Sequence, residues 1–177
     1  MRKLWFDTEF IEYEAVLEDG RKFPVTDPIS FAVVDLEGRS FMAVFKEFNR
    51  AAAEQNEWVT ENVLAKLPDE STWQTRDQIR EGLLDFIGED PTEFRYWYAP
   101  QDAVILHKIF AVSFLDQPEN VKGSPFNIAQ KFQEMAVPSA YIPLNMDKHE
   151  VLSDAIWTRD FDLAMDQYLI DIQENSL

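Results

Sequence analysis

The chain has 177 residues, 46% of them apolar and 14% aromatic, which predicts a single domain over residues 1–177 with a sizeable core. It contains no cysteine, which excludes disulfides and thiolate metal sites, and no apolar run that approaches the length of a membrane span, so we expect a cytoplasmic protein. The formal charge of −17 argues against a protein that holds long nucleic acid through many phosphate contacts, because such binding needs a face rich in lysine and arginine.

The first part of the chain predicts three strands. Residues 2–10 alternate between two faces, which is the period of a strand. Residues 29–36 and 40–48 are β-rich runs separated by a short Glu-Gly-Arg loop, so we expect three sequential antiparallel strands. The acidic segment 12–28, which contains an Asp-Gly pair and two prolines, is expected to be a loop or a small excursion.

The remainder of the chain predicts helices and one more strand. An apolar helical stripe that includes Trp58 begins near residue 57 and is ended by Pro68. A second helix is marked by a capping box of Thr75 and Gln78 and stops at Gly88. An aromatic strand is expected over residues 94–99, and further helices over residues 102–112, 126–136 and from about 149 or 151 to about 170. Together these elements predict an α/β fold, with a mixed β-sheet flanked by helices.

Four acids and one histidine stand in three short runs that are far apart in the sequence. They are Asp7 and Glu9, then Asp102, then His149 and Asp154. If folding brings them together, these groups would hold two divalent cations and a general base, which is the apparatus for hydrolysing a phosphodiester. Because oxygen ligands favour Mg²⁺ or Mn²⁺, those are the expected ions. An enzyme is therefore the leading hypothesis.

The first pair of acids lies on a strongly apolar strand. Asp7 and Glu9 can face one point in space, because positions i and i+2 of a strand point to the same side. A bare Asp-x-Glu triplet is common on solvated strand edges and alone would mean little. Here two carboxylates on one face would be costly unless metal, hydrogen bonds or water satisfied them, so the flanking residues favour a site.

The other acids are ambiguous when each is considered alone. Asp102 follows Pro100 and is then best explained as the N-cap of the next helix, a role compatible with facing a cleft. His149 and Asp154 would be roughly 140° apart on a helix, so we expect His149 in the loop or first turn and Asp154 one turn into the helix. His149 alone could be a surface histidine. The other histidine, His107, lies mid-helix and is expected to be structural.

The three runs resemble the exonuclease motifs of the DEDDh branch of the 3'-to-5' exonucleases. The matching features are Phe-Asp-Thr-Glu-Phe, a tyrosine-containing strand followed by Asp102, and His-x4-Asp-Ala, in that order. More narrowly, residues 6–12, 62–68 and 97–102 are similar to the polyadenylate-specific exoribonuclease (RNase AS) group. Three motifs in order, with a shared middle segment, are a fairly specific signal.

The resemblance implies an RNase H-like fold, two Mg²⁺ or Mn²⁺ ions, and stepwise release of nucleoside 5'-monophosphates from the 3' end of a single strand. RNA is the favoured substrate and a preference for adenylate is implied, while a homodimer is left open. The resemblance also implies that His149 is the general base and that Thr8 and Phe10 contact the terminal nucleotide. The metal ligands that it implies are Asp7, Glu9, Asp102 and Asp154.

Three alternatives stay open at this point. A single-stranded DNA exonuclease is one, because spacing does not locate contacts to a 2'-hydroxyl. A non-catalytic module that binds a nucleotide or a partner is another, although all five chemical groups are retained. The third is an acidic mimic of nucleic acid, which would have no use for a histidine beside an aspartate pocket. If His149 is the base, it must be neutral to act, so activity should climb from acid toward mildly alkaline pH.

Overall fold

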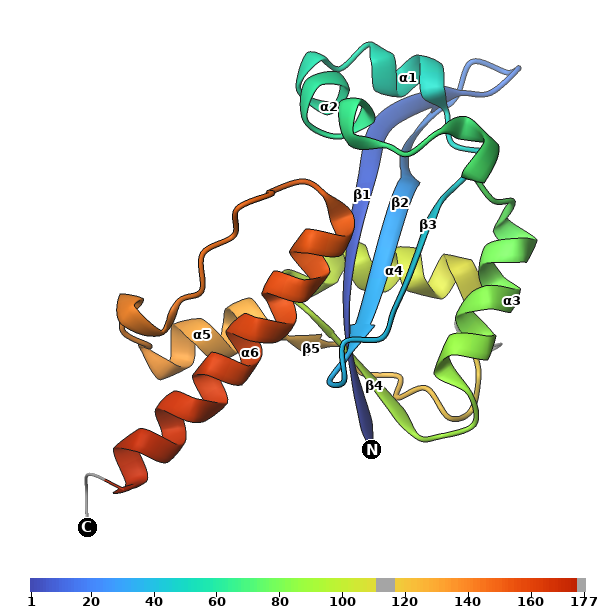
Figure 1. Ribbon diagram of the computed structural model, residues 1–177. Helices are drawn as coiled ribbons and strands as arrows, with labels where there is room; N and C mark the ends of the chain where they lie inside the picture. The colour runs from blue at the N-terminus through green and yellow to red at the C-terminus, as the bar shows by residue number, and fades with distance from the viewer. Residues whose placement is uncertain (111–116, 175–177) are drawn as a thin grey trace.

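A mixed five-stranded sheet, with strands in the order β3-β2-β1-β4-β5, organises the structure (Figure 1). This computed structural model describes residues 1–110 and 117–174. β1 is antiparallel to β2 and parallel to β4, while β2–β3 is antiparallel and β4–β5 is parallel. The expected α/β class is confirmed, and the strand order is consistent with an RNase H-like fold. The strands are β1 (Arg2–Val16), β2 (Lys22–Asp35), β3 (Ser40–Val44), β4 (Thr92–Tyr96) and β5 (Phe126–Asn127).

Helices cover both faces of the sheet. Figure 1 shows α5 and α6 on one side, α3 and α4 on the other, and α1 and α2 at one end, and a separate apolar cluster fills each of these contacts. Over residues 1–110 and 117–174, no helix is both long enough and apolar enough to cross a bilayer. The helices are α1 (Arg50–Glu54), α2 (Glu57–Asn62), α3 (Arg76–Ile87), α4 (Ala99–Phe110), α5 (Ile128–Met135) and α6 (Val151–Glu174), with 3₁₀ turns η1 (Leu64–Lys66), η2 (Glu70–Thr72) and η4 (Ser139–Tyr141).

The first hairpin is much longer than the sequence suggested. The prediction of a loop over residues 12–28 is wrong, because β1 continues to Val16 and pairs with β2 from Lys22 onward. Residues 17–21 form the turn, where Gly20 has a φ of 83°. β3 and β4 do not pair with this outer part of the hairpin, so the backbone of each proline there can face away from a partner strand. The strand can therefore accommodate both prolines, because neither has to donate a hydrogen bond to a neighbouring strand.

A β-bulge interrupts this hairpin at the place where the carboxylates lie. Glu9 pairs with Ser30 whereas Phe10 pairs with Pro28, so Ile29 is the extra residue on β2. Bulges bend a strand and re-aim its side chains, and they are frequent beside functional sites. The bulge therefore separates the buried part of β1, which carries the acids, from the outer hairpin.

The structure also corrects the expected end of the fourth strand. β4 stops at Tyr96, and α4 begins at Ala99 with Pro100 in its first turn, where the missing N–H of proline is tolerated. Asp102 consequently lies inside the first turn of the helix, so its interpretation as an N-cap is wrong. Residues 111 and 112, the last of the expected 102–112 helix, lie outside the described residues.

Other local predictions are confirmed in part, and two short elements were missed. The strand predicted over residues 40–48 ends at Val44, and the helix predicted from about residue 57 to Pro68 is α2, which ends at Asn62 and is followed by the 3₁₀ turn η1. α3 begins at the predicted capping box, with Thr75 accepting from the backbone N–H of Gln78, and Gly88 caps its end. The predicted 126–136 helix begins slightly later, at Ile128. α1 and β5 have five and two residues and carry no periodic pattern long enough to predict.

A buried polar cluster fixes the position of α6 against the sheet. Asp162 is fully buried and accepts hydrogen bonds from Trp5 Nε1 (3.0 Å), Arg95 Nη1 (2.5 Å) and Lys131 Nζ (2.8 Å). Burial acts to raise the pKa of Asp162, but the bonds from Lys131 and the charge of Arg95 hold it below its ordinary value. Because these partners come from β1, β4 and α5, they anchor the middle of α6 against the sheet.

Candidate active site

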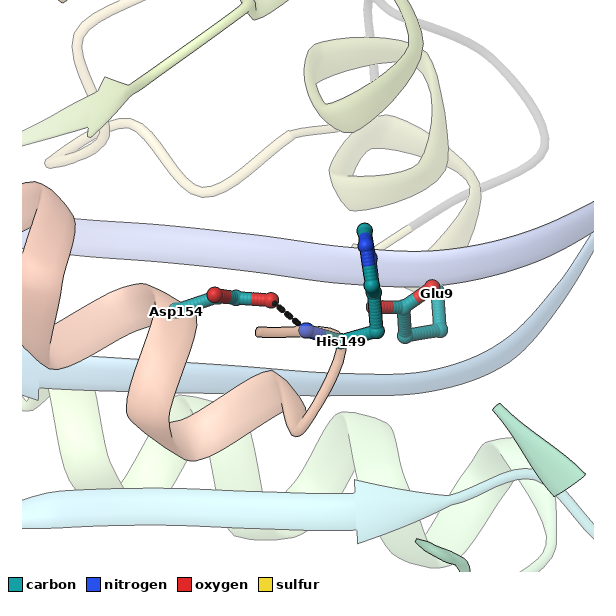
Figure 2. Close-up of side chains that lie close together, drawn as sticks. All are labelled: Glu9, His149 and Asp154. Carbon is teal, nitrogen blue, oxygen red and sulfur yellow. Dashed lines mark hydrogen bonds and ion pairs between the residues drawn. The ribbon is translucent and has the colours of Figure 1, made fainter. Parts of the chain in front are cut away.

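Three of the predicted side chains meet where the start of α6 crosses β1. Glu9, His149 and Asp154 each offer a ligand atom, and these atoms lie within 4.8 Å of one another. His149 Nδ1 is 3.8 Å from Glu9 Oε1. Figure 2 shows Glu9 on β1, and His149 and Asp154 on the segment that opens α6. This geometry can hold one metal ion.

The backbone around His149 explains how the histidine reaches the strand. His149 lies just before α6 with a φ of 63°, in the left-handed region, and Asp154 lies in the first turn, as expected. Asp154 Oδ2 accepts a hydrogen bond from the backbone N–H of His149 at 2.7 Å, drawn as a dashed line in Figure 2. The amide of Asn145 donates to the other carboxylate oxygen of Asp154. Asp154 therefore holds the histidine segment as well as facing the site.

Asp7 lines two adjoining hollows, and the first of them contains this group of side chains. A hollow of about 370 Å³ is lined by Asp7 together with Glu9, His149 and Asp154. An adjoining hollow of about 150 Å³ is lined by Asp7 together with Phe10, Tyr98 and Asp102, and Thr8 and Trp97 line both. All seven residues selected from the sequence, Asp7, Thr8, Glu9, Phe10, Asp102, His149 and Asp154, thus line two hollows that share Asp7.

Thr8 reaches the second hollow from the opposite face of β1. Its hydroxyl donates to Asp102 Oδ1 at 2.6 Å, and both side chains are buried. Thr8 therefore positions the carboxylate of Asp102 in this structure. Its expected contact with a terminal nucleotide stays a prediction, as does that of Phe10.

The carboxylates are crowded enough to change their protonation. Burial, followed by repulsion from Asp154, raises the pKa of Glu9 to about 8, although Lys66 acts in the opposite direction. Burial and then the charges of Asp102 and Asp154 raise the pKa of Asp7 well above its ordinary value. Burial likewise raises the pKa of Asp102 to about 7 against the hydrogen bonds from Thr8. Burial and mutual repulsion thus disfavour the ionised form of all three carboxyl groups, and bound cations would relieve that cost, so the donor set fits divalent metal ions.

Comparison with known proteins identifies relatives of this chain. No family model matches it. Two similar proteins are 3'-5' exoribonucleases from two strains of Mycobacterium tuberculosis, each 32% identical over 158 residues, which is 86% of this chain and 86% of the relative. The chain belongs to this 3'-5' exoribonuclease family. Membership confirms the coarser part of the resemblance, namely a 3'-5' exonuclease family.

In this member of the exoribonuclease family, the surroundings of His149 include residues that sequence reasoning missed. Trp58, expected on an apolar stripe, is 50% exposed, and its ring meets the imidazole edge to face at a centroid distance of 4.8 Å. Lys66 donates to the backbone carbonyl of Lys148, next to His149. Segment 62–68, singled out in the motif comparison, therefore packs beside the site, and that match was the available signal for Lys66.

Proposed function

We propose that this chain is a metal-dependent 3'-5' exoribonuclease that shortens single-stranded RNA from its 3' end and releases nucleoside 5'-monophosphates. The observation that carries the proposal is the meeting of Glu9, His149 and Asp154 beside Asp7, in a chain that is similar to named exoribonucleases over most of its length. The motif segments shared with the RNase AS group support a preference for 3'-terminal adenylate. The terminal nucleotide would occupy the hollow beside Phe10 and Asp102.

The metal sites in this proposal use oxygen ligands from three elements. When bound, two Mg²⁺ or Mn²⁺ ions would neutralise the clustered carboxylates and stabilise negative charge on the reacting phosphate. Asp7 lines both hollows and is therefore suited to contribute to both ions. The proposed ligands are Asp7, Glu9, Asp102 and Asp154.

His149 is proposed to move the proton. Its side chain is 41% exposed, so it can meet a water molecule, and with Nδ1 toward Glu9 its Nε2 would accept the proton of the attacking water. The water oxygen forms a bond to the terminal phosphorus, and the bond from that phosphorus to the 3' oxygen of the preceding nucleotide breaks. The departing 3' oxygen takes up a proton, which gives a new 3'-hydroxyl end and a nucleoside 5'-monophosphate.

A substrate panel tests this proposal directly. Oligo(A), oligo(U), mixed RNA and single-stranded DNA, each labelled at the 5' end, are incubated with Mn²⁺ or with EDTA, and the released products are identified by chromatography. We expect metal-dependent shortening of RNA, fastest for oligo(A), with 5'-monophosphates as products. Equal degradation of DNA would favour the DNA exonuclease, and binding without cleavage would favour a binding module.

Trp58 offers a test of how the histidine is positioned. Because its ring packs on the imidazole, we expect Trp58→Ala to lower kcat on oligo(A) about tenfold, since small displacements of a catalytic group are costly. KM and the melting temperature should change little, because the side chain is half exposed, and Trp58→Phe should retain most of the activity. Steady-state kinetics of the three proteins check this. An increase in KM at constant kcat would show instead that Trp58 contacts substrate.

A further inference from the structure

Most, but not all, of the basic side chains of this acidic protein form ion pairs. The structure describes all sixteen lysines and arginines, and ten of them form ion pairs with carboxylates. The other six have no ion-pair partner among the described residues, and two of them, Lys66 and Lys148, lie beside His149. Three of the remaining four gather in one place. They are Arg76, Arg80 and Lys108.

These three cations line a hollow of about 640 Å³ between α3, α4 and β2. Arg80 Nε donates to the carbonyl of Phe110 at 2.7 Å, Arg76 Nη1 to the carbonyl of Lys108 at 3.4 Å, and Lys108 Nζ to the carbonyl of Thr26 at 3.2 Å. Since all these acceptors are neutral, each head group is held in place while it keeps its charge and has further N–H donors to offer. The hollow is therefore preorganised for an anion.

Two acids also line this hollow, and one of them already accepts a hydrogen bond from the backbone. Asp27 accepts a hydrogen bond from the backbone N–H of Asn49 at 2.8 Å. Asp77 lies in the first turn of α3, where the helix dipole favours a negative charge. The hollow thus keeps an excess of positive charge in a chain whose formal charge is −17.

The basic hollow adjoins the carboxylate site. Phe10, which lines the hollow of Asp7 and Asp102, pairs across the hairpin with Pro28, which lines the basic hollow. α4 connects the same two places, because Asp102 lies in its first turn and Lys108 lies six residues later, about 9 Å along the helix axis. A strand that leaves the carboxylate site past Phe10 would therefore meet the three cations.

We propose that Arg76, Arg80 and Lys108 bind backbone phosphates of the upstream nucleotides of a single-stranded RNA whose 3' end lies at Asp7 and Asp102. The inference rests on the proposed function and adds the surface that holds the rest of the substrate. It also accounts for how a strongly acidic chain can retain RNA, since a few local phosphate contacts take the place of a basic face. The contacts are to the backbone, so this surface does not select bases.

The test compares a long and a short substrate at several salt concentrations. We expect the triple variant Arg76→Gln, Arg80→Gln, Lys108→Gln to lower kcat/KM on a 5'-labelled oligo(A) dodecamer at least about tenfold at low salt. The dependence of log(kcat/KM) on log[salt] should weaken by about 0.7 for each phosphate that the variant no longer neutralises, which is about 2 in total. A dinucleotide does not reach the cations, so its turnover should stay within about twofold. Each single glutamine variant should show about one third of the change in slope, which keeps the test valid if the triple variant does not fold.

A matched control removes the same charge elsewhere. Arg21, Lys22 and Arg50 are exposed and paired with carboxylates at the hairpin turn and on α1, so their triple glutamine variant should keep the salt slope of the parent. The inference is overturned if the Arg76, Arg80, Lys108 variant cleaves the dodecamer with the parental slope while the dinucleotide is still cleaved. If the parent cleaves no substrate, the proposed function fails separately. Fluorescence anisotropy of labelled oligo(A) with the same variants then decides the inference, since an unchanged salt slope of binding overturns it and a weakened slope supports it.

Discussion

Asp7→Asn is expected to lower kcat on oligo(A) about 10³-fold and, at the same time, to raise the melting temperature of the metal-free protein at pH 8. The loss of activity follows because Asp7 lines both hollows of the proposed two-metal site. The gain in stability follows because burial, and then the charges of Asp102, Asp154 and Glu9, disfavour the ionised form of Asp7 in the folded chain, and an amide of the same shape avoids that cost. Kinetics with Mn²⁺ and thermal unfolding in EDTA measure the two effects.

The two effects of this substitution should have opposite sign, which separates a site residue from a structural one. Asp85→Asn is the control, because Asp85 is an exposed aspartate on α3 whose replacement should change neither quantity. Retained metal-dependent turnover in Asp7→Asn would refute the assignment of Asp7 as a metal ligand. A lower melting temperature in EDTA would instead refute the unfavourable burial and crowding of this carboxyl group.

The metal-free protein should lose stability as the pH rises, and divalent metal should restore it. The pKa of Glu9 is about 8 and that of Asp102 about 7, against ordinary values of 4.5 and 3.8. Between about pH 4 and 8 the folded chain therefore binds more protons than the unfolded chain, and the free energy of unfolding falls with increasing pH. The stability is fully present below the unfolded values and is lost as the pH passes through the folded ones. We expect a fall of at least about 3 kcal/mol between pH 5 and 8, because one pKa unit corresponds to about 1.4 kcal/mol and the raised pKa of Glu9 alone accounts for more than two such units over that range.

Urea unfolding in EDTA across this pH range measures the fall. Repeating the series with Mn²⁺ at about a hundredfold excess over its dissociation constant should recover about 3 kcal/mol at pH 8, because only the folded chain assembles the ligands. Glu9→Gln should flatten the pH dependence in EDTA, since it removes one of the raised carboxyl groups. A profile in EDTA that does not fall between pH 5 and 8, or that Mn²⁺ leaves unchanged, would contradict a buried metal-binding cluster.

Several features of the fold could be predicted because they depend on residues that are near one another in the chain. The alternation in residues 2–10 indicated the strand that carries Asp7 and Glu9, and the Thr75–Gln78 capping box marked the start of α3. The five-residue spacing predicted His149 in the loop or first turn and Asp154 one turn into the helix, and the structure has His149 just before α6 and Asp154 in its first turn. These are local geometric constraints, and burial of the sheet did not change them.

The wrong predictions have different physical causes. Segment 12–28 has the composition of a loop, but the alignment of β1 with β2 makes most of it a strand. Pro100 suggests the end of a strand, whereas the chain has already left the sheet at Tyr96 and uses the proline in a first helical turn. Trp58 fits an apolar stripe, yet it packs on a histidine ninety-one positions away in the sequence.

By itself, the amino-acid sequence determined which side chains are candidates for the chemistry, because carboxylate and imidazole identities and their i, i+2 spacing on a strand are properties of short runs. Only the tertiary structure decided that Asp7 joins two hollows, that Asp102 is held by Thr8, and that cations of α3 and α4 gather beside Pro28. These contacts join residues far apart in the chain, so they depend on how helices pack across the sheet and on where a bulge turns β1, neither of which is encoded in any single segment.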